Sequence, residues 1–353
     1  DIDCGQFVNL LKRGRIEGHK TDDKSEPLEN AVFGLFTADC VKFSRDTAIM
    51  TAVSDENGFF EFDDVPFGKY IVREIESPRG YILSDKEYTV SISEDGEVIE
   101  ITAENKPITV EISKRDIYGN ELEGAEMVLE NADGETVDKW TSDGKNHIVS
   151  KLGTGEYVLK EIAAPDGYII ATDIKFNVDV YGNVTVENVD STAVSDNGDP
   201  LITMVDDTTK VQISKQDITT GEELPGATLQ IIDEDGNVVE ERVSTDEAHF
   251  IEGKLIAGKE YTLRETIAPD GYEIANEIRF TVNEDGSVTE VVMYDEHTPD
   301  LETPPTVIID IPHTGVSADN SAELYLVATA VIMVFGMVIY KKNDKEQRKD
   351  DVK

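Results

Sequence analysis

A twelve-residue element occurs three times in the chain and constrains its fold more than any other feature. The copies YIVREIESPRGY, YVLKEIAAPDGY and YTLRETIAPDGY cover Tyr70–Tyr81, Tyr157–Tyr168 and Tyr261–Tyr272. Before the proline, apolar and polar side chains alternate as in a β-strand with one buried face. The alternation places Glu74, Glu161 and Glu265 on the apolar face and the basic residues on the opposite face. Each copy is therefore predicted to point a carboxylate into a core.

The composition excludes some classes of function. The 353 residues include 74 acidic and 32 basic side chains, for a formal charge of −42, which excludes a nucleic-acid-binding surface. Two cysteines, Cys4 and Cys40, form neither a disulfide framework nor a metal site, and one bridge or two separate thiols are both open. The five histidines do not have ligand spacing, so no metal or cofactor is expected. Because no signal peptide precedes Asp1, we expect a processed or partial chain.

The repeat divides the chain into domains. Many short strand-like runs, turn motifs such as ENG and EDG, and the lack of helical periodicity predict an all-β fold with one β-sandwich in each repeat. The second repeat carries an insertion, DSTAVSDNGDP, which is interpreted as a surface loop. The predicted parts are an N-terminal tail (1–14), domain 1 (15–107), domain 2 (108–208), domain 3 (209–298), a Pro-containing spacer (299–310) and a C-terminal segment (311–353).

The first and last strands of each repeat also place polar residues on the inward face. Alternation along the opening strands points one lysine inward in each repeat, namely Lys20, Lys114 and Lys215. The closing strands point Asn105, Asp206 and Asp295 inward. Asn105 and Asp206 each precede the next inward lysine by nine residues. Asn188 is the alternative to Asp206, since it also alternates with valines, but it does not fit this spacing.

The group of three inward-facing residues in each repeat has two interpretations. One is a salt bridge whose charges must all be paired. The other is chemical: desolvation lowers the pKa of a lysine and raises that of a glutamate, which favours a neutral nucleophilic amine and a neutral acid. The acid polarises the Asn or Asp carbonyl and transfers protons, and the product is an isopeptide bond. Ammonia leaves from Asn and water leaves from Asp.

The C-terminal segment has three consecutive parts. The pentapeptide Ile311-Pro312-His313-Thr314-Gly315 is followed by an apolar run over 324–340 and a basic tail that begins at Lys341. A run of this length is near the lower limit for a transmembrane helix, and the lysines mark the cytoplasmic side. A buried core helix and a plain single-span anchor with a chance pentapeptide are the alternatives.

The chain resembles Gram-positive surface proteins built from SpaA/CnaB-like pilin domains with a prealbumin-like fold. The repeated element is similar to the pilin E-box, and the C-terminal segment is similar to an LPxTG sorting signal. The resemblance implies three isopeptide bonds: Lys20–Asn105 with Glu74, Lys114–Asp206 with Glu161, and Lys215–Asp295 with Glu265. It also implies cleavage by a sortase between Thr314 and Gly315, and attachment to an amine of peptidoglycan or of a pilin subunit.

The sequence thus predicts a wall-anchored extracellular stalk, adhesin or pilin-type subunit that turns over no external substrate. Its membrane span would serve only until sorting. Two alternatives remain: a module that binds a host protein or glycan, and the C-terminal support of a larger surface enzyme. The first domain departs most from the family pattern, because GHK precedes its lysine and SPRGY replaces APDGY.

Overall fold

The computed structural model describes residues 11–188 and 192–299. Within these ranges every regular element is a β-strand, as the sequence predicts. No helix in these ranges has the length and apolar character needed to cross a membrane. The predicted sorting pentapeptide, the apolar run over 324–340 and Cys4 lie outside the described residues.

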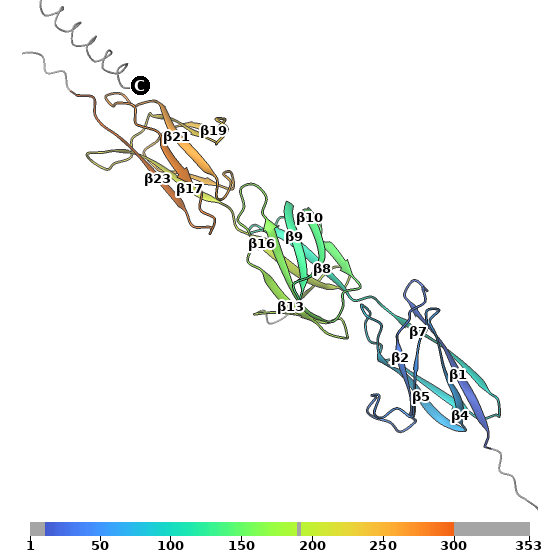
Figure 1. The fold of residues 1–353 in the computed structure, drawn as a ribbon. Helices are drawn as coiled ribbons and strands as arrows, with labels where there is room; N and C mark the ends of the chain where they lie inside the picture. Colours follow the sequence, from blue (N-terminus) through green and yellow to red (C-terminus); the bar gives the residue numbers. More distant parts are fainter. Residues whose placement is uncertain (1–10, 189–191, 300–353) are drawn as a thin grey trace, which may run out of the picture. The chain divides into compact units, whose positions relative to one another are not determined.

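Each domain consists of two sheets, and Figure 1 shows their strands. Domain 1 has the sheets β4-β1-β7 and β3-β2-β5-β6, formed by β1 (Arg13–Asp22), β2 (Val32–Thr37), β3 (Met50–Val53), β4 (Phe59–Pro66), β5 (Gly68–Glu76), β6 (Glu87–Ile92) and β7 (Val98–Asn105). Its first strand begins two residues before the predicted boundary at Arg15.

Domain 2 has the sheets β11-β8-β16-β15 and β10-β9-β12-β13-β14. Its strands are β8 (Thr109–Asp116), β9 (Glu123–Asn131), β10 (Thr136–Asp143), β11 (His147–Ser150), β12 (Gly155–Ala163), β13 (Ile174–Val178), β14 (Val184–Val186), β15 (Ala193–Val194) and β16 (Pro200–Asp206). The insertion that was interpreted as a loop therefore contains a short strand, β15, which joins the sheet beside β16.

Domain 3 has the sheets β20-β17-β23 and β19-β18-β21-β22. Its strands are β17 (Lys210–Asp217), β18 (Thr228–Ile232), β19 (Val238–Val243), β20 (His249–Glu252), β21 (Glu260–Ile267), β22 (Ile278–Thr281) and β23 (Thr289–Asp295). The buried apolar residues of each of the three cores belong to a single domain. Residues up to Thr298 form one compact unit.

The first and last strands of each domain are parallel neighbours in one sheet. β1 pairs with β7, β8 with β16, and β17 with β23, as Figure 1 shows for β17 and β23. The register is the same each time: Lys20 lies opposite Ala103, Lys114 opposite Met204, and Lys215 opposite Met293. Because side chains two residues apart point to the same face, the Asn or Asp that ends each closing strand shares a face with this lysine.

The repeated element forms a strand and a tight turn. Its strand is β5, β12 or β21, and the amide of its last tyrosine donates a hydrogen bond to the carbonyl of its proline, at 3.1 Å in all three copies. The glycine between them has φ of +85° at Gly80, +86° at Gly167 and +87° at Gly271. This left-handed conformation is strained for any residue with a Cβ, which explains why the glycine recurs in a Pro-x-Gly-Tyr turn.

Candidate functional site

Each domain buries one lysine, one glutamate and one Asn or Asp in contact with one another. The lysine and the Asn or Asp lie on the parallel pair of strands, and the glutamate reaches them from the repeated element in the opposite sheet. All nine side chains are at most 4 % exposed. The structure therefore brings together, within each domain, the three residues that the sequence pattern points inward.

In domain 2, Lys114 lies between two carboxylates. Its Nζ is 3.1 Å from Oε2 of Glu161 and donates a short hydrogen bond to Oδ1 of Asp206. The backbone N–H of Ala171 donates to Oε2 of Glu161 at 2.7 Å, which fixes the carboxylate. Asn188, the alternative to Asp206, is exposed. Asp206 is therefore the side chain positioned for attack by Lys114.

Domain 3 repeats this arrangement. Nζ of Lys215 is 3.1 Å from Oε1 of Glu265 and donates a short hydrogen bond to Oδ1 of Asp295. The N–H of Ala275 donates to Oε2 of Glu265 at 2.7 Å. In both domains this donor lies ten residues after the glutamate. The Pro-x-Gly-Tyr turn thus returns the chain so that the backbone itself orients the glutamate.

Domain 1 differs in its acceptor. Nδ2 of Asn105 donates to both carboxylate oxygens of Glu74, at 2.9 and 3.0 Å, and Nζ of Lys20 is 3.6 Å from Oε1 of Glu74. The N–H of Ser84 holds the other carboxylate oxygen at 3.0 Å. A half-turn of the amide exchanges its oxygen and nitrogen, after which a protonated Glu74 donates to Oδ1. The three residues of the cluster are therefore in contact, but Asn105 presents its Nδ2 to Glu74, whereas the reaction needs its Oδ1 there.

Burial sets the protonation of these groups. Desolvation lowers the pKa of Lys20 and raises the pKa of Glu74 and of Glu265. The pKa of Asp206 is raised from 3.8 to about 7, chiefly by desolvation and further by the charge of Glu161. In domain 1 the directions for Lys20 and Glu74 favour a neutral amine beside a neutral acid, which is the state that a condensation needs.

Several polar atoms of the clusters lack a hydrogen-bond partner among the described residues. They are Nζ of Lys20, Oδ1 of Asn105, Oε1 of Glu161, Oδ2 of Asp206, Oε1 of Glu265 and Oδ2 of Asp295. A buried charge that is incompletely paired destabilises a domain. Condensing the lysine with its Asp would replace two incompletely hydrogen-bonded buried groups by one neutral amide, so the folded core itself favours the bond.

Two residues outside the clusters were not identified from the sequence. Glu111 lies on β8 and is only 3 % exposed, because the insertion covers it. Asp217 in domain 3 accepts a hydrogen bond from the Tyr272 hydroxyl at 2.8 Å, and this bond lowers its pKa to about 2. Cys40 forms no disulfide with any described residue, and its Sγ lies 3.2 Å from the carbonyl oxygen of Lys42.

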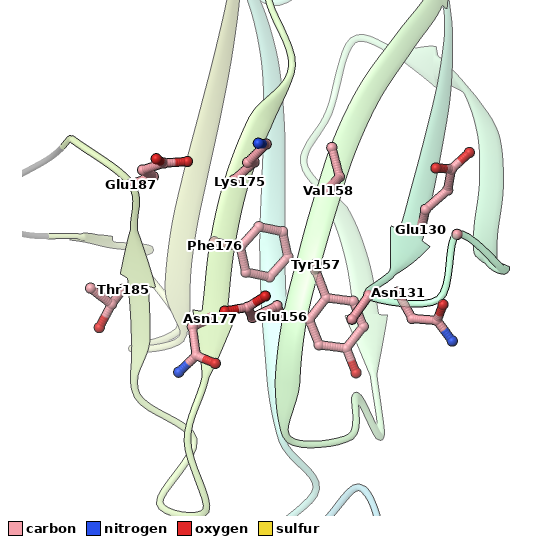
Figure 2. Close-up of a pocket in the computed structure, with 12 residues that line it drawn as sticks. Glu130, Asn131, Glu156, Tyr157, Val158, Lys175, Phe176, Asn177, Thr185 and Glu187 are labelled. Atoms are coloured by element: carbon pink, nitrogen blue, oxygen red, sulfur yellow. The ribbon is translucent and has the colours of Figure 1, made fainter.

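A groove of about 540 Å³ lies on domain 2 away from its cluster. Figure 2 shows lining side chains on β12, β13 and β14, among them Val158, Lys175 and Thr185, and Glu187 lies just after β14. Its two aromatic residues, Tyr157 and Phe176, are stacked with ring centroids 5.5 Å apart and are buried in the core. The groove therefore offers no exposed aromatic platform of the kind that would favour glycan binding.

The fold and the clusters define a class of all-β domains with a buried lysine, a glutamate and an Asn or Asp. A family model of the SpaA prealbumin-like fold domain matches residues 14–107, 108–192 and 209–297. These matches cover more than half of the chain. The chain therefore belongs to the SpaA prealbumin-like domain family. The second match ends before β16, the strand that carries Asp206.

Solved structures show similarity over most of the described chain. The Bacillus anthracis TIE protein is 25 % identical with a TM-score of 0.40, over 81 % of this chain and 51 % of its own. This chain thus spans about half of that protein. BcpA, the major pilin subunit of Bacillus cereus, is 17 % identical with a TM-score of 0.35, over 81 % of this chain and 100 % of its own. SpaD, the major pilin of Corynebacterium diphtheriae, is 13 % identical with a TM-score of 0.37, over 83 % of this chain and 100 % of its own. A comparison with curated protein sequences found no match.

Proposed function

We propose that this protein is a pilin-type or adhesin-type stalk of a Gram-positive cell surface, in which each domain closes by an internal isopeptide bond. The observation that carries the proposal is the buried cluster, repeated three times in one strand register. In the family to which the chain belongs, such a cluster forms this bond. A sortase would then join Thr314 to a wall or pilin amine, with Ile311–Gly315 as its recognition sequence.

The proposed reaction is a condensation without a cofactor. The neutral Nζ of Lys114 attacks Cγ of Asp206 while Glu161 donates a proton to the carbonyl oxygen. The amine proton passes by way of Glu161 to the departing hydroxyl, which leaves as water. The carbonyl oxygen then returns its proton to Glu161, and a neutral Cγ–Nζ amide remains. Lys215, Asp295 and Glu265 react in the same way in domain 3. In domain 1 the amide nitrogen of Asn105 leaves as ammonia.

The bond would make each domain resistant to force. It joins the first and last strands, which are the two strands through which tension enters and leaves a domain. A chain pulled at its ends would therefore load a covalent link before the hydrogen bonds of the sandwich could separate. Unlike a disulfide, an amide does not depend on the redox conditions outside the cell.

The mass of the intact protein tests the proposal. We expect the folded protein to be lighter than its sequence by two waters and one ammonia. Glu161→Ala and Glu265→Ala should each restore one water, and Glu74→Ala should restore the ammonia. Exposed Glu126→Ala, on the neighbouring strand β9, is the control and should keep all three losses. An unmodified mass for the folded protein would contradict the proposal and leave buried ion pairs.

The rate of condensation in domain 2 should fall as the pH rises above about 7. The pKa of Asp206 is raised to about 7, so above this pH the acid becomes a carboxylate, which resists attack by an amine. Unfolded Asp206 has its ordinary pKa of 3.8. Folding of the uncondensed domain therefore takes up a proton between about pH 4 and pH 7, and its stability falls as the pH rises through this window.

This dependence can be measured by refolding unlinked protein from denaturant at different pH values and following the loss of water by mass spectrometry. Asp206→Asn serves as the control, because the asparagine side chain does not titrate. The condensation rate of this variant should therefore not fall as the pH rises above about 7. A rate for the natural domain that increases steadily from pH 7 to pH 9 would show that deprotonation of the lysine, rather than protonation of Asp206, limits the reaction.

A further inference from the structure

The closing strands lie at or near the edge of their sheets, and the three domains protect this edge differently. Within the described residues, β7 and β23 end their sheets, whereas β16 is followed by β15. An edge strand presents unpaired N–H and C=O groups to which another extended chain can bind, unless charge or an added segment blocks it. The edge beside the closing strand can therefore be compared among the three domains.

Domains 1 and 2 each have a protective feature. The outward face of β7 carries the exposed residues Glu100, Thr102 and Glu104, so charge covers this edge. In domain 2 the strand β15 pairs antiparallel with the start of β16. Glu111 holds this segment in place, because its Oε1 accepts hydrogen bonds from Ser195 Oγ and Asn197 Nδ2, both at 2.8 Å. This fold thus accommodates an additional antiparallel strand beside its closing strand.

Domain 3 has no strand beyond β23 in its described residues, and β23 carries one glutamate, Glu290, on its outward face where β7 carries two. Beside β23 lies a groove of about 390 Å³, lined in part by Ile218, Ile274, Val292 and Tyr294. Ile218 is 53 % exposed, Ile274 61 % and Tyr294 49 %. The three domains can be aligned on their inward lysine, on the last tyrosine of the repeated element and on their inward Asn or Asp. In domain 1 the residues that correspond to Ile218, Ile274 and Tyr294 are then Asp23, Leu83 and Glu104. Domain 2 has the apolar residues Ile117, Ile170 and Val205 there, next to the strand that β15 partly covers.

The border of this groove is acidic. Glu273 and Glu296 line it, and Glu290 lies on β23 itself. Among the described residues, no basic side chain forms a salt bridge with any of the three. A second copy of this chain, with its formal charge of −42, would bring further glutamates to the groove. Charge complementarity therefore favours a basic partner over self-association.

We propose that the outer edge of β23 and the groove beside it bind an extended segment of a partner protein that alternates apolar and basic residues. The segment would add to the sheet β20-β17-β23 as a further strand, with backbone hydrogen bonds to β23. Its apolar side chains would contact Ile218, Ile274 and Tyr294, and its lysines or arginines would face the glutamates. This binding does not require the isopeptide bonds, so the two proposals can fail separately.

The test uses residues 1–298, which form a compact unit with a complete core in each domain. The probe is a nine-residue synthetic peptide that alternates valine and lysine. We expect it to slow amide hydrogen exchange in β23 and to weaken in binding as salt is added. Two control peptides isolate the two contributions: glutamate in place of lysine reverses the charge, and a central proline removes a backbone donor. Each should bind at least tenfold more weakly.

Protein variants locate the site. Tyr294→Asp and Ile274→Asp alter exposed side chains of the groove, so the fold should persist, and each should weaken binding of the lysine peptide at least tenfold. The matched control is Ile148→Asp, which alters a side chain in domain 2 that is 55 % exposed and should bind the peptide as the natural protein does. The proposal is overturned if the lysine peptide does not protect the β23 amides that point away from β17, if the proline peptide binds equally well, or if these outward-pointing amides are already protected without any peptide.

Discussion

Replacing Glu161 with glutamine is expected to leave domain 2 without its cross-link and to lower its free energy of unfolding by about 4–5 kcal/mol. Lys114 and Asp206 are 92 residues apart in sequence, so a bond between them closes a long loop in the unfolded chain. Glutamine preserves the size of the side chain but cannot carry the proton that the condensation requires. The contact between Lys114 and Asp206 remains in this variant, so most of the lost stability belongs to the bond.

Chemical denaturation, followed by hydrogen exchange in domain 2, measures the change, and the mass of the same sample shows whether water has been lost. Glu156→Gln is the matched control, since Glu156 is exposed on the same strand, β12, and its replacement should alter neither quantity. A Glu161→Gln protein that still loses the water would show that another group moves the proton. Equal stability of the linked and unlinked forms would contradict the loop-closure argument.

Much of each cluster could be predicted from the sequence because the strands obey a period of two. Lys114 alternates with Val110 and Ile112, and Glu161 with Tyr157 and Leu159, so one pattern indicates the inward face in both sheets. The threefold repetition then distinguishes this pattern from chance. The same reasoning could not establish that the first and last strands are neighbours, because pairing between distant strands leaves no periodic signal in either of them.

The position of β15 within the insertion could not be predicted from the sequence. β15 has only two residues, too few for alternation to be recognised, and its position depends on Glu111, which lies 84 residues before Ser195. Glu111 stands between Val110 and Ile112, so the alternation of β8 places it on the face opposite to theirs. Its burial arises from a segment of the chain that covers that face, and no local pattern encodes such a contact.

Replacing Asp206 with asparagine is expected to preserve the bond in domain 2 while changing its leaving group. The lysine then displaces ammonia instead of water, so the natural protein and the variant should mature to the same mass although their sequences differ. Asp206→Ala should abolish the loss altogether, because no electrophilic carbon remains beside Lys114. The buried lysine would then keep only Glu161, 3.1 Å from its Nζ, as a charged partner.

The same measurement distinguishes Asp206 from Asn188. If Asn188 were the acceptor, domain 2 of the natural protein would lose ammonia, and Asn188→Ala would abolish the loss. The exposure of Asn188 and the direct contact of Lys114 with Asp206 favour the opposite result. Peptide mapping after protease digestion should find Lys114 joined to the peptide that contains Asp206, and Asn188→Ala should leave this linkage unchanged. A linkage to Asn188 would mean that β14, rather than β16, lies beside β8 when the bond forms.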